Sequence, residues 1–184
     1  MLLDIALGIF GAIAFAKIEN INLSLILIII GVLFALLPDI DFVFYWLKGE
    51  KLNAQTHTHR QLLHAPLIFI PIGFLIILSL NTPLAFLFAI LTLLHFVHDS
   101  IGIGWGIHWF YPFSRRFYKL FSTKDGKFSK KLFVSWTPEE QKIAAEHYGD
   151  KNWIRNIYFK PTLISIVEFL IFIIALLALV LIKF

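Results

Sequence analysis

Five long apolar runs, separated by short polar stretches, dominate the sequence. They cover residues 1–16, 21–37, 62–80, 83–99 and 161–182. The last run is long enough to cross a hydrocarbon core of ~30 Å at 1.5 Å per residue. The first four have about 16 to 19 residues each, slightly fewer than the ~20 of a typical span. The pattern predicts an all-α integral membrane bundle of about five transmembrane helices, in a single domain of residues 1–184.

Proline and glycine mark the ends of these runs. Pro38 ends the second run, because proline cannot continue a helix, and Pro71 inside the third run is expected to kink it. After the fourth run, glycines at positions 102, 104 and 106 break the helix and open the aromatic stretch WGIHWFYPF. Such a stretch is typical of the headgroup level of a bilayer.

Residues 101–160 form a polar segment between the fourth and fifth runs, and we expect a short interfacial helical segment in it. Thr137-Pro138-Glu139-Glu140 is a capping box with proline at the first helical position, so a surface helix should begin there and stop at Gly149. Residues 114–136 are basic with interleaved aromatic side chains. Beside a membrane span, this composition favours binding to membrane lipids with anionic headgroups, and no nucleic acid partner is expected.

The composition agrees with a membrane protein. Of the 184 residues, 59% are hydrophobic and 15% are charged, with a mean hydropathy of +0.81. A soluble domain of this size needs far fewer apolar residues. The absence of cysteine excludes disulfides, thiolate nucleophiles and cysteine-ligated metal centres, so any metal site must use His, Asp and Glu.

The end of the fourth run carries the clearest candidate for such a site. On a helix, His95 and Asp99 are four residues apart and share one face, and His98 flanks them. An imidazole and a carboxylate on adjacent turns can chelate one cation.

Further candidate ligands fall on the same side of the membrane if each run crosses once. One side of the membrane, which we call the rim, then holds four of the run ends. They are the start of the first run, the end of the second, the start of the third and the end of the fourth. That rim carries Asp4, Asp39, Asp41, His59, His64, His95 and Asp99. Helix ends are polar anyway because they face water, but ionisable groups at membrane depth are costly and usually functional, so the set favours a metal site.

The distribution of cations predicts the orientation of the chain. The rim side carries Lys48, Lys51, Arg60 and every Lys and Arg from position 115 to 160, whereas the other side has only Lys17 and Lys183. The positive-inside rule therefore places the site and the N-terminus on the cytoplasmic side of a prokaryotic inner membrane, with the C-terminus outside.

Three motifs resemble those of the YdjM-like inner-membrane proteins, a family described as membrane-bound metal-dependent hydrolases. They are LLPDID at 36–41, HRQLLH at 59–64, and HFVHD at 95–99 followed by GIHWFYPF at 106–113. The resemblance implies a metal-dependent hydrolase and places Asp39, Asp41, His59, His64, His95 and Asp99 at the motif positions of the family. The family usually has a histidine four residues before the glycine of the first helix, where this chain has Asp4 before Gly8. The His-x-x-x-Asp pair is also similar to part of the site in zinc-dependent phospholipases C and related nucleases.

The residue set predicts hydrolysis of a phosphoester by water activated on a divalent cation, and the membrane location, rather than any motif, favours a lipid or lipid-linked substrate. Oxygen and nitrogen ligands suit zinc, with manganese and iron as alternatives, and an aspartate-rich set suits two ions bridged by a carboxylate or hydroxide. In this hypothesis Arg60 orients the phosphate, and either His98 or a ligand carboxylate moves the proton.

Two other functions stay open from the sequence: a divalent-metal carrier, and a non-catalytic membrane protein held together by a structural metal. A carrier should have polar groups at the midplane and on both sides. His57 and His108 are expected at the interface rather than on the metal, and His147 at a helix end. Glu168, inside the last run, is open as a ligand, a base or a partner within the bundle.

Overall fold

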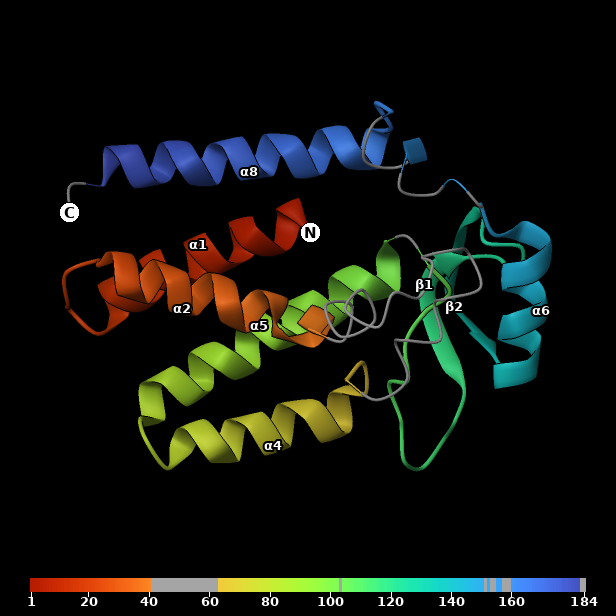
Figure 1. The fold of residues 1–184 in the computed structure, drawn as a ribbon, viewed down its shortest axis with the longest axis horizontal. Coiled ribbons are helices and arrows are strands. Elements are labelled where there is room, and N and C mark those ends of the chain that lie inside the picture. Colours follow the sequence, from red (N-terminus) through yellow and green to blue (C-terminus); the bar gives the residue numbers. More distant parts are fainter. Residues whose placement is uncertain (41–62, 103, 151, 153–154, 157–159, 183–184) are drawn as a thin grey trace. The chain divides into compact units, whose positions relative to one another are not determined.

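The computed structural model describes residues 1–40, 63–102, 104–150, 152, 155–156 and 160–182. The helices are α1 (Leu2–Ile18), α2 (Leu25–Leu36) with the 3-10 turn η1 (Leu37–Asp39), α4 (Pro66–Leu78), α5 (Thr82–Ile101), α6 (Pro138–Tyr148) and α8 (Leu163–Leu181), and the strands are β1 (Phe117–Ser122) and β2 (Phe128–Trp136) (Figure 1). The chain divides into two compact units, the first made of Met1–Leu37, Ile70–His95 and Lys160–Phe184, the second of Pro38–Phe69 and Phe96–Phe159.

Backbone contact between α1 and α2 organises the first unit. A Cβ atom on Gly8 would lie 2.5 Å from the Cα of Val32, and one on Gly31 would lie 2.4 Å from the carbonyl oxygen of Gly8. Ala12 is fully buried beside them. Small residues at matched positions let two apolar helices approach this closely, a packing mode common in membranes.

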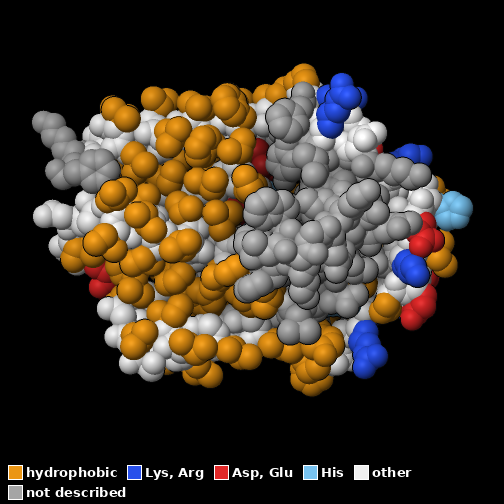
Figure 2. Space-filling view, in the orientation of Figure 1, with side chains coloured by type: hydrophobic (Ala, Val, Ile, Leu, Met, Phe, Trp, Pro, Cys, Tyr) orange, Lys and Arg blue, Asp and Glu red, His pale blue; other side chains and the backbone are white. Residues whose placement is uncertain are grey.

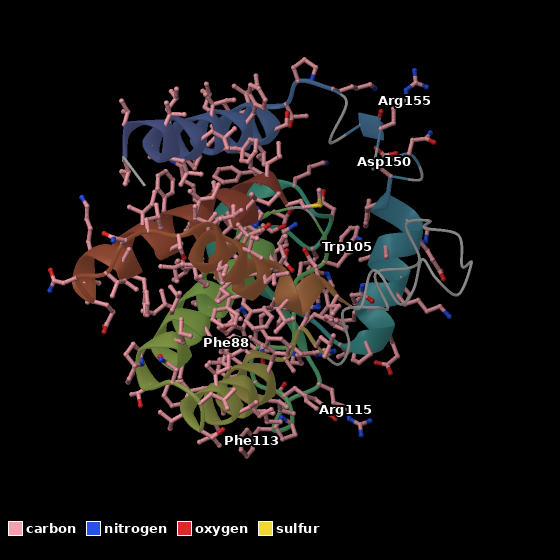
Figure 3. The ribbon with its side chains drawn as sticks, turned by 60° about the vertical axis from the view of Figure 1, so that its left-hand side comes forward. Phe88, Trp105, Phe113, Arg115, Asp150 and Arg155 are labelled. Carbon is pink, nitrogen blue, oxygen red and sulfur yellow. The ribbon has the colours of Figure 1, made fainter. Side chains whose placement is uncertain are left out.

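The first part of α5 completes this core. Leu87 and Leu91 are buried in the same cluster as the α1 and α2 residues. Phe88 is fully buried and packs edge-on against Phe34, with ring centroids 5.3 Å apart (Figure 3). Pro71 lies inside α4, as predicted, two residues before Gly73, where an added Cβ would meet the Phe88 ring.

Helix α8 packs on α1 through few of its residues. Ala175 is fully buried, but only 6% of the most apolar 18-residue stretch of α8 is buried inside the protein. Its other side chains are mostly exposed Leu, Ile, Val and Phe, and Figure 2 shows hydrophobic side chains over the visible helical face. An exposed surface of this kind fits contact with lipid.

The structure corrects the expected number of spans. Among the described helices, α5 (20 residues) and α8 (19 residues) are long and apolar enough to cross a membrane. Helices α1, α2 and α4 have 17, 12 and 13 residues. At 1.5 Å per residue, a 12-residue helix reaches only ~18 Å of a hydrocarbon core of ~30 Å. The chain is therefore mostly helical, with two candidate spans rather than a demonstrated bundle of five.

The all-α prediction is also wrong for residues 101–160, because β1 and β2 form an antiparallel sheet there. Phe117 pairs with Trp136, and Leu120 with Phe133. Trp105, Phe117 and Trp136 are buried in the core of this unit together with Ala144 and Ala145 of α6 (Figure 3). The hairpin escapes detection because Lys119 occupies a buried position and Phe133 an exposed one, which inverts the usual alternation.

The surface helix in this unit forms as predicted. The Thr137 hydroxyl accepts from the Glu140 amide, and the Glu140 carboxylate accepts from the Thr137 amide, so the capping box is complete. Pro138 is the first helical residue and Gly149 follows the last turn. Glu140 also bonds to Lys124 at 2.7 Å and lies 3.5 Å from the Arg116 guanidinium, which joins α6 to the hairpin.

Candidate metal centre

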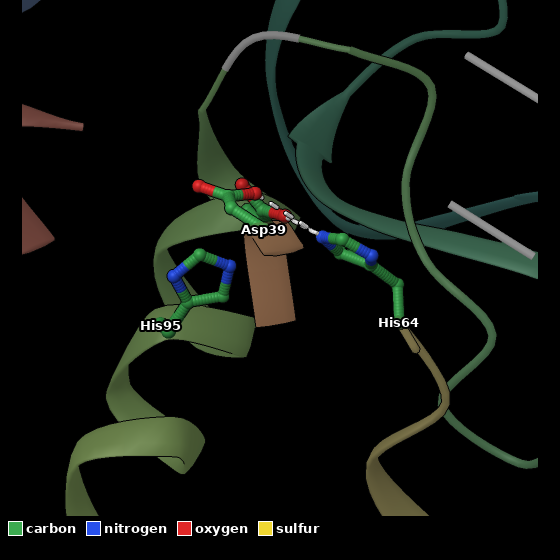
Figure 4. A group of neighbouring side chains, drawn as sticks. Asp39, His64 and His95 are labelled. Atoms are coloured by element: carbon green, nitrogen blue, oxygen red, sulfur yellow. Dashed lines mark ion pairs between the residues drawn. The ribbon is translucent and has the colours of Figure 1, made fainter. Parts of the chain in front are cut away.

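A histidine lies between two carboxylates in the second unit. Asp39 ends the 3-10 turn after α2, His64 lies in the turn before α4, and Asp99 lies in the last turn of α5. The His64 Nε2 atom is 3.5 Å from Asp39 Oδ1 and 3.2 Å from Asp99 Oδ2 (Figure 4). The imidazole therefore contacts two carboxylates from different elements.

His95 extends this group along α5, one turn before Asp99 on the same continuous helix. One ligand atom from each of Asp39, His64, His95 and Asp99 lies within 4.8 Å of the other three. In a tetrahedral zinc site with ~2.1 Å bonds, neighbouring ligand atoms are ~3.4 Å apart. The two His64–carboxylate distances already match that value. The four ligand atoms therefore fit around one cation if the longer distances among them, up to 4.8 Å, shorten.

Burial and charge support a cation at this group. His64, His95 and Asp99 are 0%, 1% and 8% exposed, while the Asp39 side chain is 35% exposed. Two carboxylates at close range and low exposure repel each other unless a proton or a cation lies between them. Two carboxylates and two neutral imidazoles together carry a negative charge that a divalent cation balances. The partly exposed Asp39 side chain gives solvent access to the group.

Asp4, which like His95 belongs to the first unit, contacts the His95 ring. Its Oδ1 atom is 3.2 Å from His95 Nδ1, and its Oδ2 atom is 2.9 Å from the α-amino group of Met1. Glu168 of α8 is 3.9 Å from the same amino group. A carboxylate on one ring nitrogen is the arrangement that orients metal-binding histidines in proteins. Asp4 is outside the four-residue group, and its predicted role as a ligand stays a prediction.

Among the remaining predicted residues, some fall outside the described part of the chain, and the described ones lie elsewhere. Asp41, His57, His59 and Arg60 lie outside the described residues. The His98 ring lies beside Gly102, since its Nε2 atom would be 3.7 Å from an added Cβ there.

His108 packs into the second unit instead. Its ring stacks on Phe117 with centroids 3.9 Å apart, and its Nδ1 atom is 3.3 Å from the Arg116 carbonyl oxygen. Burial lowers the pKa of His108 below 6.5 and outweighs the effect of that carbonyl.

Residues 107–109 connect the sheet to the centre, and we name them the brace loop. Ile107 exchanges two backbone hydrogen bonds with Tyr118 of β1, at 3.0 and 2.8 Å. The His108 amide donates to the His64 carbonyl at 3.3 Å, and Trp109 Nε1 donates to the Ser100 hydroxyl at 2.7 Å. The loop thus supports His64 and the residue next to Asp99.

The sequence signal for the brace loop was present but was interpreted as an interfacial aromatic stretch. Gly106, which precedes the loop, has a φ of +83°, and an added Cβ would lie 2.4 Å from the Tyr118 carbonyl oxygen. Glycine is therefore required for the close approach of this loop to β1.

The comparisons with known proteins identify one family. The sequence model described as YdjM inner membrane protein matches residues 3–184, nearly the whole chain. Neither the search of curated proteins nor the search of solved structures gave a match. The match confirms the resemblance that the motifs indicated.

Proposed function

The chain belongs to the family of YdjM inner membrane proteins, and from this premise we propose that it is a membrane-bound metal-dependent phosphoester hydrolase. The family name supplies the membrane location and no activity. The observation that carries the proposal is the group formed by Asp39, His64, His95 and Asp99, whose ligand atoms lie within 4.8 Å of one another.

The donor set defines the kind of cation. Two imidazoles and two carboxylates, with no thiolate in the chain, suit zinc, manganese or iron. When bound, such an ion supplies a Lewis acid for a phosphoryl oxygen and lowers the pKa of water. The group offers enough ligands for one ion. A second ion, held with Asp41 and His59 from outside the described residues, is part of the proposal.

In the proposal, other residues of the chain orient a ligand, admit and bind the substrate, and move the proton. Asp4 Oδ1 lies 3.2 Å from His95 Nδ1, and a carboxylate at this position favours the Nδ1–H tautomer, which keeps the other ring nitrogen available as a ligand. Asp39 lies on the exposed side of the group, from which a substrate phosphate can approach. In the proposed reaction Arg60 binds that phosphate, and His98, next to Asp99 in the chain, exchanges the proton.

We place the site on the cytoplasmic side, with the N-terminus inside. The support is the concentration of Lys and Arg in the segments flanking the predicted rim. A membrane protein that cleaves phosphoesters meets them most readily in lipids and lipid-linked compounds, and this favours a substrate of that class.

The partial exposure of Asp39 favours catalysis over a purely structural metal, because structural sites are closed by protein ligands. The clustering of the described ligands in one group favours catalysis over a carrier, which would need polar groups at the midplane and on both sides.

Hydrolysis by the full-length protein in lipid nanodiscs tests the proposal. The protein is loaded with Zn²⁺ or Mn²⁺ and given bis(p-nitrophenyl) phosphate and short-chain phosphatidic acid. We expect turnover that Asp99→Asn reduces by about 100-fold or more, while Asp125→Asn, a change in the hairpin, leaves it unaltered. Bound metal without turnover of either probe would point to a structural role, and turnover unchanged in Asp99→Asn would place the activity elsewhere.

A further inference from the structure

The β1–β2 hairpin has one buried face and one face that the described part of the second unit leaves partly exposed. The pairs Phe117–Trp136 and Lys119–Val134 lie on the buried face, where Phe117, Lys119 and Trp136 are at most 6% exposed. Paired residues of an antiparallel sheet share a face, and successive pairs alternate. The pairs Tyr118–Ser135 and Leu120–Phe133 therefore lie on the opposite face, which we name the outer face.

The outer face is rich in exposed aromatic side chains. Phe133 is 65% exposed, and Phe110 is 52% exposed while its ring packs edge-on against Tyr118 at 5.0 Å. Phe128 lies beside the turn of the hairpin, beyond the register shift, where it pairs with Ser122; the alternation of the regular pairs therefore does not place it on the outer face, but its side chain is 84% exposed. Leu132, the neighbour of Phe133 in β2, is 53% exposed. Several large apolar side chains gathered on one hairpin mark an interaction surface rather than a scatter of single exposed residues.

Cations surround these side chains. Residues 114–136 contain seven Lys and Arg and one acidic residue, Asp125. Asp125 pairs with Lys127, and Glu140 pairs with Arg116 and Lys124. Lys130 and Lys131, on β2 beside Leu132 and Phe133, are exposed.

Phe113 and Arg115 extend the same composition. Both are exposed, Phe113 to 88%, and both follow the Tyr111–Pro112 bond that leads into β1 (Figure 3). Aromatic rings with adjacent Lys and Arg are the composition of segments that lie at the headgroup level of an anionic bilayer.

We propose that the hairpin rests in the headgroup region of a bilayer containing anionic phospholipids, with Phe133 of the outer face and the exposed Phe128 beside the turn as its apolar contacts. Charge selects this partner, because exposed Lys130 and Lys131 complement anionic headgroups. Location selects it too, because a member of an inner membrane family always has a bilayer within reach. The inference concerns residues outside the metal centre and stands independently of the proposed hydrolysis.

Single-cysteine labelling tests this inference on the full chain, which contains no cysteine of its own. Phe133→Cys and, separately, Phe128→Cys carry a nitroxide in nanodiscs of phosphatidylglycerol with phosphatidylcholine, or of phosphatidylcholine alone. The matched control is Glu146→Cys on the exposed side of α6. Collision with oxygen and with a water-soluble nickel chelate reports whether each label lies in lipid or in water.

We expect both hairpin labels to collide more with oxygen than with the chelate in anionic nanodiscs, and the Glu146 label to do the reverse. The hairpin labels should shift toward water in phosphatidylcholine alone, and equally in the Lys130→Gln, Lys131→Gln background. Water exposure at both hairpin positions in anionic lipid would overturn the proposal. So would shielding from both reagents, which signals a protein contact, or a lipid exposure that does not depend on lipid charge.

Discussion

His64 and His95 both contact carboxylates, but in different ways. His64 Nε2 contacts Asp39 and Asp99, both of which can also ligate a cation. His95 uses Nδ1 toward Asp4, which lies outside the four-residue group. At the scale of residues, Asp4 is thus best explained as the group that fixes the His95 ring.

Asp4→Asn tests this role. The amide keeps the shape of the side chain but removes the charge that favours the His95 Nδ1–H tautomer. We expect the affinity for Zn²⁺ to fall by about 10- to 100-fold, measured by competition with a chelator. Asp125→Asn in the hairpin is the matched control. An Asp4→Asn protein with unchanged affinity would show that Asp4 does not position His95.

The sequence predicted that His95 and Asp99 lie on one helix, where their spacing fixes their relation, and both belong to the group that could hold a metal ion. Asp39 and His64 were grouped with them only by counting membrane crossings, which gives a common side but no distance. The Asp4–His95 contact needed the packing of α1 in three dimensions. No periodicity in the chain contains that information.

At the scale of elements, the brace loop links β1 by hydrogen bonds to the segments that carry His64 and Asp99. Its bonds run from Tyr118 through Ile107 and His108 to His64, and from Trp109 to Ser100. Two ligands from separate segments keep their spacing only if such contacts hold them.

A double-mutant cycle on Trp109 and Ser100 tests the brace. Trp109→Phe and Ser100→Ala each remove the same hydrogen bond, which is worth about 1 kcal/mol of unfolding free energy. We expect each change to lower that free energy and to weaken zinc binding. The double variant should lose less than the two single losses combined, and strict additivity in thermal unfolding would show that the two side chains are not coupled.

The contact of α1 with α2 makes a second prediction at this scale. Gly8→Ala places a methyl group against the backbone of Val32, and we expect a loss of about 1–3 kcal/mol in the unfolding free energy. Gly11→Ala on the same helix meets side-chain methyl groups of Leu91 and Leu87, the nearest at 2.8 Å, and should cost less because side chains can move. Equal thermal shifts for the two variants would contradict this packing.

The pH dependence of the α6 attachment follows from Glu140. The hydrogen bond from Lys124, with the Thr137 amide, lowers the pKa of Glu140 below 4.5. Since the folded-state pKa is lowered, the ionised form stabilises the fold above the unfolded-state pKa, and this stabilisation is lost as the pH falls through the folded-state pKa.

Glu140→Gln keeps an acceptor for the capping box and removes the titration. We expect it to lower the unfolding temperature at pH 7 and to match the wild type at the acid end of a series from pH 7 to pH 3. Glu146→Gln, an exposed change on the same helix, is the control. A constant difference between Glu140→Gln and the wild type across the series would exclude the ionised pair as its cause.

At the scale of the whole molecule, one chain combines membership of a membrane family with a group of four side chains that could hold a metal ion, three of them buried. The apolar runs predicted the membrane location because hydropathy is additive along the sequence. They predicted five spans, of which the described helices supply two candidates by length and composition, since α2 and α4 are shorter than the runs that contain them. The candidate metal centre is the feature on which the proposed chemical function rests.

Metal content therefore tests the account most directly. Elemental mass spectrometry on full-length protein, purified in detergent and exposed to Zn²⁺, Mn²⁺ and Fe²⁺, compares the wild type with His64→Ala and with His147→Ala, an exposed histidine on α6. We predict about one to two transition-metal ions per chain in the wild type and in His147→Ala, and their loss in His64→Ala. A wild type without metal, or a His64→Ala protein with undiminished metal, would contradict the assignment of this group as a metal centre.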